Sequence, residues 1–234
     1  MKRLRPRRVL LGAAALLLTV IALWPFYNPG WRYGVRGVDV SHHQGPVDWE
    51  ALRADGTTFA YIKSTEGGDW VDSRFEDNWG AADKAGLYRG AYHFFTLCAT
   101  GADQAANMIA VVPDTPGMLP PAVDLEFAGN CSARPTVDEF LSELEVFLSE
   151  LEAHYRMRPV IYTNAHFYTA YLSQKPPEAV WWMQSPILEP WGSPDWTFWQ
   201  YTPGPKRGVN GSVDRNVFNG TLTDLIALTD RKTE

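Results

Sequence analysis

Two carboxylates separated by one residue, Asp124 and Glu126, have the spacing that acid–base chemistry requires. They lie in residues 120–127, where an apolar run introduced by two prolines is typical of a buried strand. Because side chains alternate between the two faces of a strand, both acids should enter one pocket, while Val123 and Leu125 point away. Their α-carbons would lie about 6.6 Å apart, so partial desolvation would separate the two pKa values.

Such a pair is suited to cleaving a glycosidic bond. One carboxyl stays protonated and donates to the leaving oxygen, while the other stays charged and stabilises an oxocarbenium-like transition state. The alternative is that both acids lie on the solvent-exposed face of an edge strand without a chemical role, because one short motif has a high false-positive risk. The elements around the pair must decide between the two interpretations.

The composition favours one globular domain. The chain has 234 residues, 45% hydrophobic and 13% aromatic, and its ten tryptophans and ten tyrosines suit both a core and platforms for sugar rings. The net charge is -6. Residues 1–30 contain five cations and no acid, so the remainder has a net charge of -11. An acidic body without a basic stripe argues against nucleic-acid binding.

The first 30 residues form a separate segment. An apolar run at residues 9–24 follows the five cations and precedes Pro25, and its length lies between a signal-peptide core and a full membrane span. We expect residues 1–30 to be an uncleaved inner-membrane anchor, with the remaining domain, residues 31–234, on the periplasmic or extracellular side. Cleavage as a signal peptide, followed by secretion, is the alternative.

The two cysteines agree with export. Cys98 and Cys131 each follow a strand-like segment and have no Cys-x-x-Cys spacing for metal or redox work. We predict a disulfide between them; two separate buried thiols are the alternative.

Five strand-helix alternations precede three strands that largely lack helices. The predicted strands are residues 35–41, 58–65, 88–95, 120–127, 158–164, 179–184, 196–201 and 212–218. The predicted helices are residues 48–53, 74–85, 103–112, a long helix from about 137, and 166–172. Capping boxes at residues 73–76 and 136–139 support two of the helix starts. The pattern predicts an α/β fold, an irregular TIM-like barrel of parallel strands.

Chemistry in such barrels collects at the C-terminal ends of the strands. The polar residues that occupy these ends are Asp39, Lys63, Tyr92, Asp124, Glu126 and Tyr162.

Seven segments together resemble the family 25 glycoside hydrolases, the Chalaropsis-type lysozymes. They are residues 37–45, 61–67, 90–94, 123–126, 161–163, 199–201 and 213–214, and the resemblance covers about residues 35–220. It implies an irregular barrel that hydrolyses the β-1,4 bond between N-acetylmuramic acid and N-acetylglucosamine in peptidoglycan.

The resemblance also implies roles for single residues. Glu126 would be the general acid and Asp124 its charged neighbour, while Asp39 and Asp214 complete an acidic cluster. The nucleophile stays open between a carboxylate, with Asp214 as candidate, and the substrate's acetamido oxygen held by Asp124; both routes retain configuration. The implied substrate-binding residues are Lys63, Glu66, Tyr92, Tyr162 and Trp199.

The family's chemistry needs no metal or cofactor, so none is expected at His42, His43 or His93, and His93 should be a hydrogen-bonded core residue. We expect a monomer in the bacterial cell envelope whose partner is peptidoglycan. The alternative functions are an inactive peptidoglycan-binding envelope protein and a hydrolase of another N-acetylhexosamine polymer, such as chitin.

Overall fold

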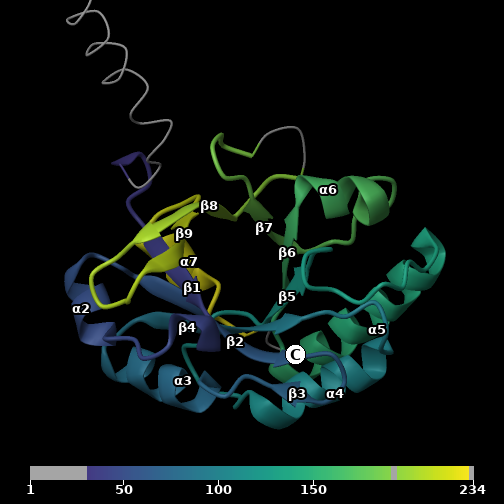
Figure 1. Ribbon diagram of the computed structural model, residues 1–234, viewed down its shortest axis with the longest axis horizontal. Helices are drawn as coiled ribbons and strands as arrows, with labels where there is room; N and C mark the ends of the chain where they lie inside the picture. Colours follow the sequence, from purple (N-terminus) through teal and green to yellow (C-terminus); the bar gives the residue numbers. More distant parts are fainter. Residues whose placement is uncertain (1–30, 191–193, 232–234) are drawn as a thin grey trace, which may run out of the picture.

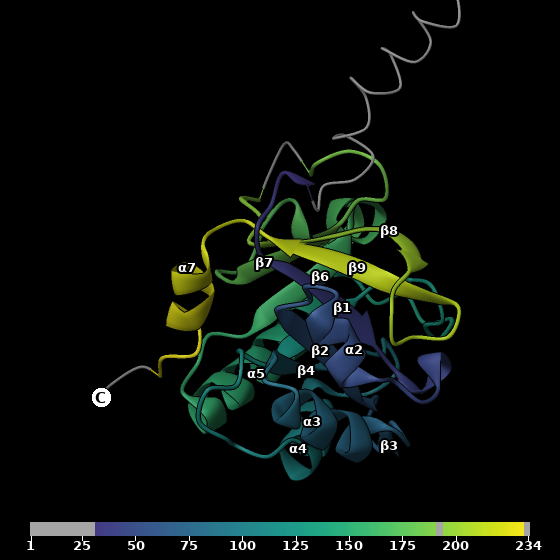
Figure 2. The same cartoon turned by 90° about the vertical axis from the view of Figure 1, so that its left-hand side faces the viewer.

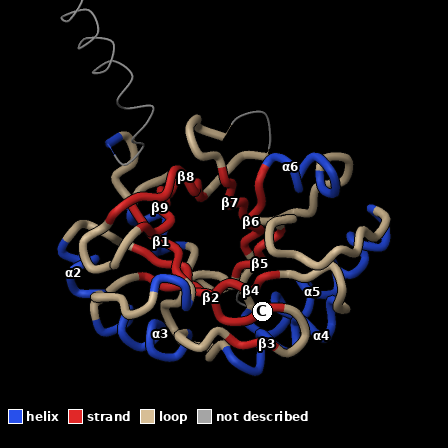
Figure 3. The backbone as a smooth tube through the Cα atoms, in the orientation of Figure 1, coloured by secondary structure: helices blue, strands red, loops and turns tan. Residues whose placement is uncertain are grey.

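The structure, a computed structural model, describes residues 31–190 and 194–231. Eight strands close into a barrel, because β1 is hydrogen-bonded to β2 on one side and to β9 on the other (Figures 1 and 3). A further strand, β3 (Trp70–Val71), forms a hairpin with β2. The barrel strands are β1 (Arg36–Val40), β2 (Phe59–Glu66), β4 (Tyr88–Phe94), β5 (Ala122–Leu125), β6 (Val160–Asn164), β7 (Val180–Gln184), β8 (Phe198–Pro205) and β9 (Ser212–Phe218).

Helices follow the first five barrel strands and are missing between β7 and β9 in the described part of the chain, which confirms the predicted irregular barrel. They are η2 (His42–Gln44) and α2 (Trp49–Ala54) after β1, α3 (Phe75–Lys84), α4 (Gly101–Val111), α5 (Val137–Tyr155), and α6 (Ala165–Phe167) with a π-helical turn, η3 (Tyr168–Leu172). The capping box of Thr136 and Glu139 opens α5 as predicted.

No helix of the described residues is both long and apolar enough to cross a bilayer. The predicted anchor lies outside the described residues.

Two local predictions need correction, and one helix was not predicted. β9 runs antiparallel to both β1 and β8, because a connection of only six residues, 206–211, cannot provide the crossover that parallel strands need. The predicted capping box at residues 73–76 is wrong, since no side chain caps α3 at its N-cap Arg74. The final helix, α7 (Leu222–Ala227), begins at an unpredicted capping box of Thr221 and Asp224.

Aromatic side chains fill the inside of the barrel. Two glycines make room for them: a Cβ on Gly37 would lie 2.4 Å from the Phe59 ring, and one on Gly90 would lie 2.3 Å from the Tyr61 ring. Tyr61 then stacks on Trp182, with ring centroids 4.8 Å apart. Buried Leu225 of α7 belongs to the same hydrophobic cluster, and Figure 2 shows α7 on the opposite side of the molecule from β3. With its interior filled, the barrel can bind a ligand only at an end.

The loops after β4 and β5 are linked covalently. Cys98 and Cys131 form a disulfide with their α-carbons 6.3 Å apart. The bridge therefore fixes two loops that leave neighbouring strands at the same end of the barrel.

Candidate active site

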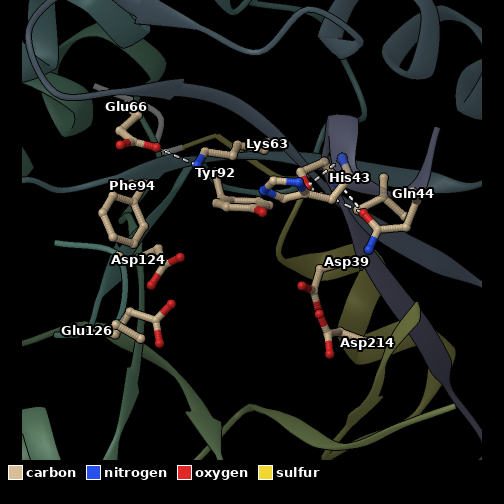
Figure 4. Close-up of a pocket in the computed structure, with 14 residues that line it drawn as sticks. Asp39, His43, Gln44, Lys63, Glu66, Tyr92, Phe94, Asp124, Glu126 and Asp214 are labelled. Carbon is tan, nitrogen blue, oxygen red and sulfur yellow. Dashed lines mark hydrogen bonds and ion pairs between the residues drawn. The ribbon is translucent and has the colours of Figure 1, made fainter. Parts of the chain in front are cut away.

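A cavity of about 310 Å³ opens at the C-terminal ends of the parallel strands. Its walls contain seven of the nine residues predicted to be catalytic or substrate-binding, namely Asp39, Lys63, Glu66, Tyr92, Asp124, Glu126 and Asp214 (Figure 4). An adjoining cavity of about 190 Å³ shares the four acids and adds Tyr162. The structure therefore brings together eight of the nine predicted residues.

The four acids form two pairs on facing walls of the cavity (Figure 4). Asp124 lies on β5 and Glu126 follows the end of that strand, as the two-residue spacing predicts. Asp39 of β1 and Asp214 of β9 lie directly opposite each other in the antiparallel register. Because β9 runs against its neighbours, its early residues reach the end of the barrel where the other strands finish.

Burial raises the pKa of all four carboxyls. At Asp39, burial and then the charge of Asp214 raise the pKa to about 7. Burial and Asp214 also raise the pKa of Glu126, against the lowering effect of Lys63, and burial raises that of Asp214. A glutamate whose pKa is raised keeps its proton to higher pH than usual, which suits it to act as a general acid.

The protonation state of Asp124 differs from the sequence-based expectation. Burial, followed by the charge of Glu126, raises its pKa well above the ordinary value, so the protonated form is favoured over the expected charged one. Its Oδ1 atom is buried and has no hydrogen-bond partner among the described residues. A ligand donor at this atom would favour the charged form again.

Lys63 supplies positive charge to the acid-rich wall. Its ammonium lies 2.6 Å from Glu66 Oε2 and packs over the rings of Trp70 and Phe94, at 5.0 and 4.9 Å from their centroids. These contacts hold a nearly buried cation beside the β5 acids.

Asp39 is held by two amides that sequence reasoning missed. Gln200 Nε2 donates to Asp39 Oδ2 at 3.0 Å, and Asn216 Nδ2 donates to the same oxygen at 2.7 Å. Tyr162 donates to the Gln200 oxygen and Trp182 to the Asn216 oxygen, both at 2.9 Å. Strand alternation could have suggested Asn216, which lies two positions after Asp214 on the same face of β9.

Trp199 does not belong to the pocket wall, which corrects the prediction. It is 2% exposed on the outer side of β8, packs against Tyr33 and Trp196, and donates to the carbonyl of Ser185 at 2.7 Å. Because neighbouring side chains point to opposite faces of a strand, Gln200 enters the cavity instead. Trp182 and Gln184 of β7 also line the smaller cavity.

Two of the three histidines discussed above have structural surroundings. His93 is fully buried between Thr65, at 2.8 Å, and Gln104, at 3.2 Å, and burial lowers its pKa to about 4, so it is neutral at physiological pH. His42 Nδ1 lies 2.8 Å from buried Asp72, and His43 lines the larger cavity. Within residues 31–190 and 194–231, no three histidine, cysteine, aspartate or glutamate side chains are arranged to hold a metal ion.

Comparisons with known proteins agree on one family. The model of the glycosyl hydrolases family 25 matches residues 38–208. Lysozyme M1 of Streptomyces globisporus is 36% identical over 220 residues, which cover 86% of this chain and 73% of that protein.

Solved structures agree with the sequence comparisons. A family 25 glycosyl hydrolase from Bacillus anthracis superposes with a TM-score of 0.79 at 36% identity, covering 84% of this chain and 94% of that one. The bacterial lysozyme of Streptomyces coelicolor superposes with a TM-score of 0.76 at 34% identity, covering 84% and 97%.

Proposed function

The chain belongs to the glycosyl hydrolases family 25, and from this premise we propose that it is a muramidase. It hydrolyses the β-1,4 bond between N-acetylmuramic acid and N-acetylglucosamine in peptidoglycan. The observation that carries the proposal is the convergence of Asp124 and Glu126 with Asp39 and Asp214 around one cavity at the barrel end.

Glu126 is the proposed general acid. It lies at the mouth of the cavity, partly buried, with a raised pKa that keeps its proton available. It would protonate the glycosidic oxygen as the bond to the anomeric carbon breaks, and the resulting carboxylate would then activate the water that completes hydrolysis.

Two groups remain candidates for the attack on the anomeric carbon. The substrate's acetamido oxygen can attack while the acetamido N–H donates to a carboxylate, and Asp124 Oδ1 is buried and without a partner among the described residues. This donor would stabilise the charged form of Asp124 as positive charge develops on the acetamido group. Asp214, across the cavity, is the carboxylate alternative. Either route retains the configuration at the anomeric carbon.

The remaining cavity residues would hold the sugars. Burial raises the pKa of Tyr92 and Tyr162 well above 10, so both keep their hydroxyl protons. Lys63 and Glu66 form an ion pair on the wall of the larger cavity, and sugar hydroxyls can bond to both charged groups. Trp182, which is 2% exposed, forms part of the β7 wall of the smaller cavity.

The N-terminal segment would keep the enzyme near its polymer in the envelope. Its cationic start and apolar run support an inner-membrane anchor with the barrel on the periplasmic or extracellular side. Carbonate extraction of membranes tests this location, since an anchored protein stays in the pellet. Release of the intact chain into the supernatant would refute the anchor.

Digestion of defined peptidoglycan, followed by mass analysis of the fragments, tests the function. We expect muropeptides that end in reducing N-acetylmuramic acid, and no comparable release of fragments from chitin. Binding to peptidoglycan without new reducing ends would instead identify an inactive binding protein. Faster cleavage of chitin would identify a different polymer as the substrate.

A further inference from the structure

The hydrogen bonds around Asp39 have a fixed direction. A tryptophan indole nitrogen carries a hydrogen and can only donate, so Trp182 requires an acceptor at 2.9 Å. That acceptor is the amide oxygen of Asn216, whose amide nitrogen consequently faces Asp39 Oδ2 at 2.7 Å.

The reverse orientation of the Asn216 amide is excluded by this contact. Turning the amide would place its nitrogen against the indole N–H of Trp182 and its oxygen against the carboxylate of Asp39. The contact with the indole would be repulsive in either protonation state of Asp39, and the contact with the carboxylate whenever Asp39 is charged, in a site where Asn216 is fully buried and Trp182 is 2% exposed. The packing of Trp182 against Tyr61 and Tyr162 holds the indole in place.

We propose that Asn216 and Trp182 are positioning residues for Asp39, which keep its Oδ2 as a permanent hydrogen-bond acceptor and leave Oδ1 as the oxygen that carries the exchangeable proton. Gln200 assists by donating to the same Oδ2, and Tyr162 orients its amide. Asn216 lines neither catalytic cavity, so it acts on the reaction through Asp39 and not by touching the substrate. The link from this arrangement to catalysis rests on the proposed function.

Other charged and titratable groups also affect the ionisation of Asp39, in addition to the two amides. Those facing the shared cavities are Asp214 of β9, Asp124 of β5, Glu126 just after β5, Tyr92 of β4, Tyr162 of β6, Lys63 and Glu66 of β2, and His43 of η2. Asp214 and Glu126 oppose ionisation of Asp39, whereas Asn216 and Gln200 favour it. Removing an amide donor should therefore move the titration of Asp39 to higher pH.

The chain contains a matched control. Trp49 donates to Asn78 Oδ1 at 3.3 Å in a second buried tryptophan–asparagine pair, which lies between α2 and α3 and away from the cavity. Replacing either asparagine by leucine removes the same groups from a buried site. Only the replacement of Asn216, next to Asp39, should change the titration of an acid in the cavity.

The experiment follows the ¹³C signals of aspartate side-chain carboxyls against pH in the full-length chain without substrate. The Asp39 signal is identified by its loss in Asp39→Asn. We expect Asn216→Leu to raise its midpoint by about 1 pH unit and Asn78→Leu to leave it unchanged. The pH profile of kcat/KM on peptidoglycan should move in the same direction.

An unchanged Asp39 midpoint in Asn216→Leu, or an equal shift in Asn78→Leu, would overturn the proposal. If Asn216→Leu does not fold, Trp182→Phe is compared with Trp49→Phe in the same way. A shift confined to Trp182→Phe supports the proposal, and its absence overturns it. Because the titration needs no substrate, its result is distinct from a failure of the wild-type chain to cleave peptidoglycan.

Discussion

Asp39 and Asp214 lie directly opposite each other across the antiparallel pair of β1 and β9. Like charges in this arrangement repel, and burial strengthens the effect. Burial and then Asp214 raise the pKa of Asp39 to about 7 from an ordinary value of 3.8. The fold therefore favours the protonated form of Asp39 and is destabilised when that proton leaves.

The first prediction is that Asp39→Asn stabilises the protein in a pH-dependent way. A carboxyl whose folded-state pKa is raised contributes stability that is fully present below pH 4 and is lost as the pH rises through about 7. The neutral amide avoids that loss, so the variant should exceed the parent by roughly 2–4 kcal/mol at pH 8 and match it at pH 4. Denaturant unfolding at pH 4, 6 and 8 measures the difference.

Asp77→Asn serves as the control for this prediction, because its carboxyl on α3 is 79% exposed. It should change stability little at any of these pH values. A gain in Asp39→Asn that is the same at pH 4 and pH 8 would show that ionisation of Asp39 is not its cause.

The second prediction concerns proton delivery by Glu126. Glu126→Gln keeps the shape of the side chain but cannot donate an acidic proton, so activity on peptidoglycan should fall by about 10²–10⁴-fold. Stability should be preserved, since burial already disfavours the charge that the substitution removes. Reducing-end assays on purified peptidoglycan measure the loss, and Glu145→Gln on the exposed side of α5 is the matched control. Wild-type activity in Glu126→Gln would remove Glu126 from its proposed role.

Local patterns were sufficient to predict most of the barrel and the β5 acids. The two-residue spacing of Asp124 and Glu126 places them on one face wherever the strand lies, so no knowledge of its neighbours was needed. The capping box of Thr136 and Glu139 likewise predicted the start of α5 without knowledge of what the helix packs against.

Features that depend on partners were not predictable from local patterns. The direction of β9 follows from its hairpin with β8, and Asn216 has a role only because Trp182 and Asp39 lie on other strands. In β8 both faces are buried, so Trp199 and Gln200 could not be assigned to the outside and inside by polarity. Burial also favours the protonated form of Asp124, whereas the family resemblance implied the charged form.

The third prediction is a large loss of stability without the disulfide. The bridge joins residues 33 positions apart, and closing a loop of that length stabilises a fold by about 3–4 kcal/mol in the chain-entropy model. The double variant Cys98→Ser and Cys131→Ser should lose this amount in denaturant unfolding. Reduction should destabilise the wild type similarly and leave the double variant unchanged. Equal stability of oxidised and reduced wild type would contradict the prediction.

The fourth prediction is that Asn130 positions Glu126 through the backbone. Asn130 Nδ2 donates to the carbonyls of Glu126, at 3.0 Å, and Phe95, at 2.8 Å, while its Oδ1 accepts from the Leu97 N–H at 2.9 Å. One side chain thus links the loop after β4 to the residue that follows β5. Asn130→Ala should lower kcat by about 10–100-fold, because small displacements of a catalytic group are costly, and change KM by less than about threefold.

A comparison with Asn219→Ala separates positioning from general destabilisation. Asn219 also donates to a loop carbonyl, that of Trp196 at 3.2 Å, but it lies after β9 and outside both catalytic cavities. Each substitution should cost about 1–3 kcal/mol of stability, because each leaves a partly buried carbonyl without its donor. Only Asn130→Ala should lower kcat at a temperature where both variants are folded. If the two variants lose kcat equally, the bond to Glu126 contributes stability and does not position the acid.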